Sequence, residues 1–383
     1  MDSTEITQFM PAPIRVVFAD SSVTIRRLLK LVLSADSDLQ ICHGASNGAE
    51  AILNFAKYSP DVVLLDVEMA VRDGIEVVEA IRRNNKLMPI IMFSSLMLDG
   101  GNTTLEAMEC GATDYVLKPP AYGHLESALG QIENELLPKI KRWGRWYQEV
   151  RQRQKSDLLM TRHMEGRPHQ LTLPPQELQH KSSLVEAVAI GASTGGPNAL
   201  AELLKSIPDD LSAPVLITLH MPAHCTGSFA ERLDKICPLS VREGFDGALV
   251  EPGNIWIAPG NQHMVTKRVG TNVKLQIENG PPENSCRPSV DVMFRSVSQT
   301  YRDRMLAVVL TGMGEDGRRG CEQIRSHGGR VIVQDEASSV VWGMPGAVVK
   351  AGLAQATVPL SEMASAITKI VHRGRPAGTE LGM

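Results

Sequence analysis

Short apolar runs alternate with longer amphipathic stretches along the first third of the chain. Between two of these runs, Ile25, Leu29, Val32 and Leu33 recur at the spacing of one helix face. Strand-like runs joined by helical segments predict an α/β domain over residues 14–136, an open, doubly wound parallel sheet of the (βα)5 type. The predicted strands are 14–19, 39–42, 61–65, 89–94 and 114–118.

The same alternation resumes over residues 184–372 and predicts a second α/β domain. Its loops are rich in glycine and proline, as in Glu251-Pro252-Gly253-Asn254. We expect residues 373–383 to be a disordered tail. The predicted strands of the second domain are 187–192, 214–219, 254–258, 273–277, 305–310 and 330–334.

Residues 137–183 separate the two patterns and differ from both. The stretch 139–162 is rich in lysine and arginine, and a polar, proline-containing segment follows it. We interpret this part as a basic helix that runs into a linker. Trp143, Trp146 and Tyr147 leave two interpretations open, a contact with a membrane surface or nucleic acid, or a solvated helix whose aromatic residues pack on a neighbouring domain. The second interpretation is favoured.

The bulk composition narrows the class of protein. A net charge of −4 gives no reason to expect nucleic acid as the main partner. No apolar stretch approaches the roughly 20 residues that span a bilayer, so we expect no membrane insertion. The acidic start of the chain does not resemble a secretory signal. The six cysteines are scattered without a CxxC pair, which suits reduced thiols and a cytoplasmic location.

Charged and polar residues end the predicted strands of the first domain. Asp20 ends the first strand and Asp66 the third, and these ends lie side by side at the switch point of a doubly wound sheet. Ser94 and Lys118 end the fourth and fifth strands and converge on the same crevice. Two carboxylates suit a Mg²⁺ ion, while a hydroxyl and an ammonium group suit phosphoryl oxygens. The pattern predicts a phosphorylation site.

Residues 14–136 resemble a response-regulator receiver domain. The motifs that carry the resemblance are Asp61-Val-Val-Leu-Leu-Asp66-Val-Glu-Met, Asp73-Gly74, Ser94-Ser95 and Lys118-Pro119. The resemblance implies that Asp66 accepts a phosphoryl group from a sensor histidine kinase, which would be a partner of this chain.

One position departs from the receiver pattern. Receivers usually carry two adjacent acids at the end of the first strand, whereas here Ser21 follows Asp20. Arg26, six residues beyond Asp20, identifies Ser21 as the second position of that pair. Losing this carboxylate removes a metal ligand, so we expect weaker Mg²⁺ binding. The alternative is a degenerate receiver that serves only for docking.

The second domain opens with a candidate nucleophile. Residues 191–196 read Gly-Ala-Ser-Thr-Gly-Gly and stand between an apolar run and a helix-like stretch. A G-x-S-x-G pattern at a strand-to-helix turn exposes the serine hydroxyl, here that of Ser193. Alone, the pattern also fits a phosphate-binding turn. It is not a dinucleotide fingerprint, because Ser193 replaces the second glycine of that motif.

A histidine and an aspartate follow at the ends of later predicted strands. His220 and Asp316 complete the parts of a hydrolase triad, although His220 alone also fits a core histidine. The order serine, histidine, aspartate disfavours the ordinary α/β-hydrolase family, whose acid precedes its histidine. The backbone N–H groups of Thr194 and Met313 are candidates for an oxyanion hole. Together these residues predict a serine esterase.

The second domain resembles the catalytic domain of chemotaxis response-regulator protein-glutamate methylesterases. The motifs are Ile190-Gly-Ala-Ser-Thr-Gly-Gly196, His220-Met-Pro222, Arg287-Pro-Ser-Val-Asp291, Thr311-Gly-Met-Gly-Glu-Asp-Gly317 and the loop 335–345. The resemblance implies a three-layer α/β domain with a mostly parallel sheet and a Ser193, His220 and Asp316 triad without a cofactor. It also implies hydrolysis of glutamate methyl esters on methyl-accepting chemoreceptors, deamidation of receptor glutamines, and control by receiver phosphorylation in a monomer.

Two other functions remain as alternatives. One is a non-catalytic signalling module in which both domains only bind partners. The other is a serine esterase of the same fold that serves another sensory system. The complete triad argues against the first alternative, and the Ser21 departure lends some support to the second.

Overall fold

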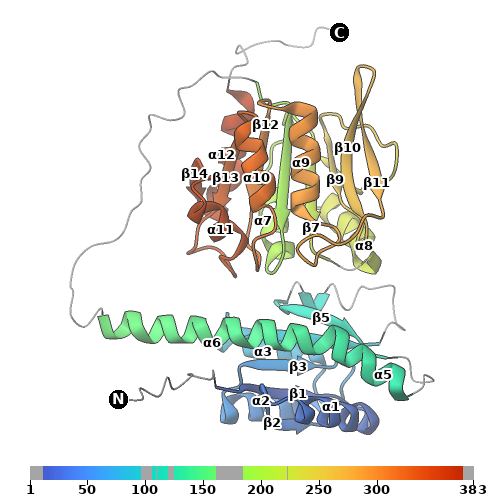
Figure 1. Cartoon of the computed structure of the whole chain (residues 1–383), viewed down its shortest axis with the longest axis vertical. Helices are drawn as coiled ribbons and strands as arrows, with labels where there is room; N and C mark the ends of the chain where they lie inside the picture. Colours follow the sequence, from blue (N-terminus) through green and yellow to red (C-terminus); the bar gives the residue numbers. More distant parts are fainter. Residues whose placement is uncertain are drawn as a thin grey trace, which may run out of the picture. The chain divides into compact units, whose positions relative to one another are not determined.

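The computed structural model describes residues 12–95, 106–108, 110–119, 125–160, 184–221 and 223–373. These residues form two compact units, one ending in a long helix and one beginning at a buried strand (Figure 1). The segment 161–183 and the tail after Arg373, for which a linker and disorder were predicted, lie outside the described residues.

The N-terminal unit is built on a parallel sheet with the strand order β2-β1-β3-β4-β5. Because β1 lies between β2 and β3, the winding reverses there, which places the carboxyl ends of β1 and β3 at the switch point where open sheets of this kind bind ligands. The predicted doubly wound sheet is confirmed. Its strands are β1 (Ile14–Ala19), β2 (Leu39–Ala45), β3 (Val62–Leu65), β4 (Ile90–Ser94) and β5 (Asp114–Leu117).

The first helices of this unit follow from local capping and amphipathic spacing. Asp73 begins one of them with a capping box, since its side chain accepts from Glu76 N and Glu76 reaches back to Asp73 N. That helix buries Val77 and Ile81 against the sheet. The helices are α1 (Val23–Ala35), α2 (Gly48–Tyr58) and α3 (Gly74–Asn84).

A continuous helical stretch closes the N-terminal unit, formed by α5 (Leu125–Gln131), η2 (Ile132–Leu136) and α6 (Leu137–Met160). Trp143 in α6 is buried, and its indole N–H donates to Asp114 Oδ2 at 2.9 Å. The Tyr147 hydroxyl accepts a hydrogen bond from Asn85 at 2.7 Å. The favoured interpretation, aromatic residues packed on a neighbouring domain, is therefore confirmed for Trp143 and Tyr147.

The basic residues of α6 pair with acids of the same unit. Lys141 Nζ lies 2.7 Å from Asp36 and 3.0 Å from Asp38, and Lys139 Nζ lies 2.6 Å from Asp114. These carboxylates stand near the beginnings of β2 and β5, away from the strand ends that carry Asp20 and Asp66. In these pairs, the lysines of α6 therefore form ion pairs within the N-terminal unit itself.

The C-terminal unit contains a seven-stranded parallel sheet in the order β14-β13-β12-β6-β7-β9-β8. Its central strands are fully buried, which explains their continuous apolar character. The predicted parallel sheet is confirmed. Its strands are β6 (Ala187–Ala192), β7 (Val215–Leu219), β8 (Ser240–Glu243), β9 (Asn254–Ile257), β12 (Met305–Val309), β13 (Arg330–Gln334) and β14 (Ala356–Val358).

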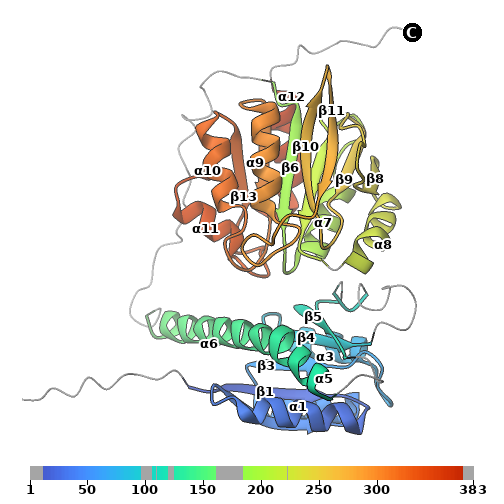
Figure 2. The ribbon, with the colours of Figure 1, turned by 45° about the vertical axis from the view of Figure 1, so that its right-hand side comes forward.

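Helices cover both faces of this sheet and complete three layers (Figure 2). One core lies under α7 (Gly196–Lys205), α8 (Ala223–Asp234) and α12 (Leu360–His372). The other lies under α9 (Val290–Tyr301), α10 (Arg318–Ser326) and α11 (Met344–Lys350). Within the described segments, none of the helices is both long and apolar enough to cross a membrane.

One predicted strand lies outside the main sheet. The run 273–277 belongs to β11 (Asn272–Glu278), which pairs antiparallel with β10 (His263–Val269) in a separate hairpin. The turn Val269–Asn272 is too short for the crossover that a parallel pair requires, so the two strands pair with each other. The predicted strand 273–277 is confirmed, and its antiparallel pairing in a separate hairpin was not predicted.

Candidate active site and receiver site

Ser193 stands at the turn that follows the buried strand β6. The chain reverses at Gly195, whose φ of 76° lies in the left-handed region that favours glycine, and then enters α7. Ser193 N–H donates to Thr311 O at 3.1 Å, and His220 N–H donates to Ala192 O at 3.2 Å. These bonds place Ser193 between the ends of β7 and β12, with its side chain partly exposed.

Gly312 packs directly against this turn. A Cβ added at Gly312 would lie 2.4 Å from Met344 Sδ and 2.9 Å from Ser193 Cβ, closer than real Cβ atoms approach, and 3.1 Å from Ser193 N. Thr311, just before it, is buried, and its hydroxyl lies 2.9 Å from Thr194 O and 3.2 Å from Val341 O. The nucleophile turn, the end of β12 and the loop 335–345 are therefore tied together.

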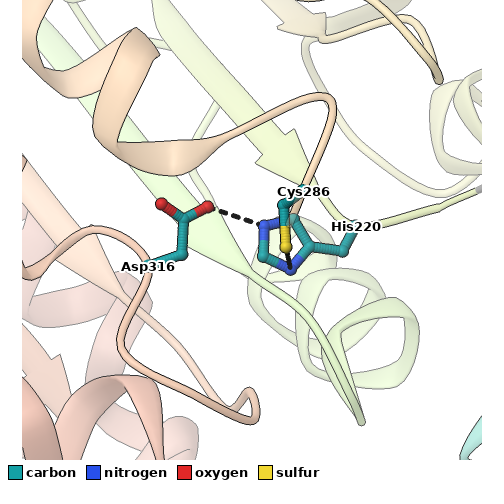
Figure 3. A group of neighbouring side chains, drawn as sticks. All are labelled: His220, Cys286 and Asp316. Carbon is teal, nitrogen blue, oxygen red and sulfur yellow. Dashed lines mark hydrogen bonds and ion pairs between the residues drawn. The ribbon is translucent and has the colours of Figure 1, made fainter. Parts of the chain in front are cut away.

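His220 and Asp316 meet although they lie far apart in the sequence. His220 follows β7, and its Nε2 lies 2.8 Å from Asp316 Oδ2 in the loop before α10 (Figure 3). The aspartate side chain is 2% exposed and that of the histidine 14%. A carboxylate on one ring nitrogen fixes the imidazole tautomer and leaves the other nitrogen, Nδ1, as the basic one.

Asp316 is held at the N-terminal end of α9. Its Oδ2 accepts from Val290 N at 2.7 Å, and its Oδ1 accepts from Asp291 N at 3.1 Å and from the Ser289 hydroxyl at 2.9 Å. Burial alone would raise the pKa of Asp316, but His220 and these N–H groups hold it at about 2. Asp316 is a permanent anion beside the imidazole.

The same pair sets the basicity of His220. Burial alone would lower the pKa of the imidazole, but the hydrogen bond with Asp316 and the neighbouring Cys286 outweigh it and raise this pKa to about 10. His220 is therefore a stronger base than a free histidine. It also holds its proton up to a higher pH.

The two predicted oxyanion donors lie on either side of Ser193. Thr194 follows it at the start of the turn, and Met313 follows Gly312 after β12. Over the residues that the structure describes, no hydrogen bond uses the backbone N–H of Thr194. Gly312, the residue before Met313, packs against Ser193, so the two candidate donors belong to turns that meet at the nucleophile. Their role stays a prediction.

Sequence reasoning missed the residues that orient Asp316. Ser289, Val290 and Asp291 belong to the motif Arg287–Asp291, to which no catalytic role was assigned, and they hydrogen-bond Asp316. Asn284 was not singled out at all, and its amide donates to Asp316 Oδ1 and Asp291 Oδ2, both at 2.8 Å. The motif Arg287 to Asp291 was the only sequence signal for these residues. It could not reveal their contacts with Asp316, because those contacts join distant parts of the chain.

Cys286 is one of the six scattered cysteines, for which no role was predicted, and it lies beside His220. Its Sγ is 3.6 Å from His220 Nδ1, on the ring nitrogen that Asp316 does not use (Figure 3). The loop that carries it was not predicted to reach the site. Among the described residues no hydrogen bond joins Ser193 Oγ to the imidazole, a contact that often forms only with substrate bound.

The predicted receiver residues meet at the strand ends of the N-terminal sheet. Lys118 Nζ lies 2.9 Å from Asp20 Oδ2 and 2.7 Å from Asp66 Oδ2. The Ser21 hydroxyl donates to Asp66 Oδ2 at 3.3 Å, so it stands where a further acid would face the cation. Ser94 is buried at the end of β4, next to the end of β5 that precedes Lys118.

These contacts fit a divalent cation. Burial and the neighbouring Asp66 carboxylate raise the pKa of Asp20, and Lys118 only partly opposes them. Two carboxylate oxygens that converge on one positive charge are the donor set that Mg²⁺ takes, completed by water. The residues at this crevice therefore suit Mg²⁺ as well as a phosphoryl group.

Family models divide the chain into the same two domains. Residues 16–130 match the response regulator receiver domain, and residues 188–367 match the CheB methylesterase. Among solved structures, the CheB methylesterase catalytic domain of Thermotoga maritima is 35% identical, with a TM-score of 0.48, and covers 49% of this chain and 100% of its own. The CheB response regulator domain of the same organism is 33% identical, with a TM-score of 0.32, and covers 35% of this chain and 97% of its own.

Curated relatives match both domains in one polypeptide. A protein-glutamate methylesterase/protein-glutamine glutaminase of Trichodesmium erythraeum is 41% identical over 93% of this chain and 98% of its own length. One of Nocardioides sp. is 40% identical over 95% of this chain and 97% of its own length. With nearly complete coverage at this identity, the chain belongs to the CheB methylesterase family and carries a receiver and a catalytic domain together.

Proposed function

We propose that this protein is a phosphorylation-regulated serine esterase that hydrolyses glutamate methyl esters on methyl-accepting chemoreceptors and deamidates receptor glutamines. The observation that carries the proposal is the hydrogen bond between His220 and Asp316 at the strand ends next to the partly exposed Ser193. Family membership supplies the substrate class. The cytoplasmic helices of the receptor are the proposed contact, so the protein would act in the cytoplasm without entering the membrane. The family resemblance suggests that it is a monomer.

In the proposed reaction Ser193 Oγ attacks the ester carbonyl. His220 takes the hydroxyl proton at Nδ1 and passes it to the leaving methoxide, so that methanol departs and an acyl-serine ester remains. Water then attacks the acyl-serine, again with His220 as base, and releases the glutamate side chain. Asp316 stays ionised throughout and stabilises the imidazolium that forms twice.

The oxyanion of each tetrahedral intermediate is assigned to the backbone N–H groups of Thr194 and Met313. Both flank Ser193, one from the nucleophile turn and one from the turn after β12. A donor of this kind typically supplies about 2.7–4 kcal/mol of transition-state stabilisation. Glutamine deamidation follows the same path with ammonia as the leaving group.

The esterase rate should rise with pH over a range that lies above the ordinary imidazole value. His220 acts as a base only when neutral, and its pKa is raised from 6.5 to about 10, so the active form accumulates as the pH rises toward that value. The measurement is kcat/KM for a model methyl ester against pH. A rising limb centred at or below 6.5 would contradict the raised basicity.

Substituting Gly312 should disable the site without unfolding the protein. The added Cβ of Gly312→Ala collides with Met344 Sδ, the end of a side chain that can move aside, and with Ser193 Cβ, which belongs to the turn itself. A displacement of about 1 Å at a reacting group costs on the order of 100-fold in rate. Esterase kinetics and circular dichroism together check this expectation. Gly130→Ala is the matched control, because no atom lies within 4 Å of its added Cβ. Equal rates in both variants would refute the close packing.

The receiver domain implies phosphorylation that depends on Mg²⁺. We assign Asp66 as the phosphoacceptor, Asp20 and Asp66 as the carboxylates that hold the cation, and Ser94 and Lys118 as contacts of the phosphoryl oxygens. Bound Mg²⁺ supplies positive charge that offsets the phosphoryl oxygens. Ser21 contributes a hydroxyl where another carboxylate would strengthen this site, so the cation is held more weakly.

Restoring the acid at position 21 should strengthen the metal site. Ser21→Asp is expected to tighten Mg²⁺ binding by on the order of tenfold, because another carboxylate joins the ligands. Calorimetric titration of the full chain with Mg²⁺ measures the change, with Ser22→Asp as a control at the neighbouring helix cap. An unchanged affinity in Ser21→Asp would argue that position 21 does not face the cation.

A serine-reactive ester probe separates this function from a non-catalytic signalling module. The proposal predicts that a phosphonate probe labels the full chain at Ser193 and that His220→Ala abolishes the labelling. A module that only binds partners would remain unlabelled. Labelling without hydrolysis of chemoreceptor esters would instead favour a serine esterase of the same fold in another sensory system.

A further inference from the structure

His220, Cys286 and Asp316 form a cluster whose chemistry exceeds the needs of ester hydrolysis. Each offers one ligand atom, and these atoms lie within 4.8 Å of one another. Asp316 and Cys286 occupy different nitrogens of the same ring, Nε2 and Nδ1 (Figure 3). The proposed mechanism uses the first contact and gives the thiol no role. An imidazole beside a thiol is a ligand pair preferred by Zn²⁺.

The spacing of the two ligand atoms suits one tetrahedral ion. Zn–N and Zn–S bonds of about 2.0 and 2.3 Å at the tetrahedral angle place nitrogen and sulfur about 3.5 Å apart. His220 Nδ1 and Cys286 Sγ are 3.6 Å apart. We infer that these two atoms form an inhibitory Zn²⁺ site, with water in the remaining positions and Asp316 as the outer carboxylate on Nε2.

The role of Asp316 in this site follows from its existing contacts. Metal-bound histidines almost always donate their other ring N–H to a carboxylate, which fixes the ring and strengthens the ligand. His220 Nε2 already lies 2.8 Å from Asp316 Oδ2. The Asp316 carboxylate is also engaged by Ser289, Val290 and Asp291, so it stays on the ring rather than moving to the ion.

The thiol is held in place by a tight turn over residues 283–286. Glu283 N donates to Cys286 O at 3.0 Å, and Cys286 N donates to Glu283 O at 2.9 Å. The two central residues, Asn284 and Ser285, have φ values of 53° and 61°, which define a turn of the I′ type. This turn fixes Cys286 relative to His220 before any ion binds.

Two side chains anchor the turn to the body of the domain. Glu283 pairs with Arg295 of α9 through two contacts of 2.5 and 2.6 Å, and Asn284 donates to Asp316 and Asp291. His220 and Cys286 nevertheless remain partly exposed, so an ion from solvent can reach them. A preorganised and accessible ligand pair is what a binding site requires.

Binding of Zn²⁺ at Nδ1 would stop the reaction proposed above, and in this respect the inference rests on the proposed function. The ion takes the nitrogen lone pair that would accept the Ser193 proton. The Cys286 thiol and, where His220 is protonated, the imidazolium each release a proton to solvent on binding. Mg²⁺ prefers oxygen ligands and leaves this pair alone. The same protein can therefore use Mg²⁺ at its receiver while Zn²⁺ inhibits its esterase.

Cobalt absorption tests the site independently of esterase activity. Full-length protein titrated with Co²⁺ should develop a thiolate-to-metal charge-transfer band that Zn²⁺ abolishes. Cys286→Ser and Cys286→Ala should lack the band, while Cys42→Ser, which alters a partly buried cysteine of the receiver, should retain it. A band that persists in both Cys286 variants would overturn the assignment.

Inhibition is measured on the same proteins, each normalised to its own rate with a chelator. Wild type should be inhibited by Zn²⁺ and restored by the chelator, with no inhibition by Mg²⁺. The half-inhibitory Zn²⁺ concentration should rise by more than about tenfold in the Cys286 variants, since even an outer partner commonly contributes that much affinity. Equal sensitivity of all variants would refute the site. A wild type without esterase activity would count against the proposed function, and the cobalt band would still decide the metal site.

Discussion

Replacing Ser193 with alanine is expected to lower the ester-hydrolysis rate by roughly 10⁴- to 10⁶-fold, the range found when a serine nucleophile is removed. Ser193 is partly exposed at the turn after β6, between the strand ends that carry His220 and Thr311. No other hydroxyl is assigned to attack the ester. Single-turnover kinetics on a model glutamyl methyl ester measure the loss.

A second serine on the same helix provides the control for this variant. Ser206 is exposed at the opposite end of α7, where its hydroxyl lies 3.4 Å from Glu202 O. Ser206→Ala should hydrolyse the ester at the wild-type rate. If Ser193→Ala retained substantial activity while Ser206→Ala behaved as wild type, Ser193 would not be the nucleophile.

Asp316→Asn is expected to lower the rate by about 10⁴-fold while leaving the fold in place. The amide has nearly the same shape, but it carries no charge to stabilise the imidazolium and can favour the wrong tautomer of His220. It also loses the anion that three groups at the start of α9 now bind, so a modest loss of stability should accompany the kinetic defect.

The pH profile separates this loss of charge from a general distortion of the site. The pKa of His220 is raised partly by Asp316, so the residual activity of Asp316→Asn should rise over a lower pH range than that of wild type. Asp209→Asn, at an exposed carboxylate after α7, should leave the profile unchanged. A residual profile centred at the wild-type pH would show that Asp316 does not govern the imidazole.

The sequence predicted the parallel sheets well because their strands are continuous apolar runs. β6, β7 and β12 are buried on both faces, so their residues are almost all apolar and the strands can be recognised from composition alone. The strands that were missed are β8, β10 and β14. Two of them are short edge strands and one belongs to an exposed hairpin, so their patterns are mixed or brief.

The candidate site also contains residues that the sequence predicted and residues that it did not. Ser193, His220 and Asp316 belong to local motifs at strand ends, and that position is visible in a sequence. The turn that brings Asn284 and Cys286 to Asp316 and His220 is not visible. Its contacts span 32 and 66 positions of the chain, and they depend on how the loop after β11 folds back over the sheet.

The receiver site shows both what the sequence predicts and where it stops. Asp20, Asp66 and Lys118 were predicted to converge because the carboxyl ends of parallel strands share one edge, and they do. The contact of Ser21 with Asp66 depends on a side-chain direction that the motif does not specify. The Mg²⁺ titration of Ser21→Asp measures what this contact means for the affinity of the cation site.

Methanol release from methylated chemoreceptor fragments measures the proposed esterase and its phosphorylation switch together. Wild type and Ser193→Ala are compared, each with and without Mg²⁺ and a small phosphodonor. We expect wild type to release methanol, and to release it faster with the phosphodonor, whereas Ser193→Ala should release none. Methanol release by Ser193→Ala at the wild-type rate, or none by wild type under either condition, would contradict the proposal.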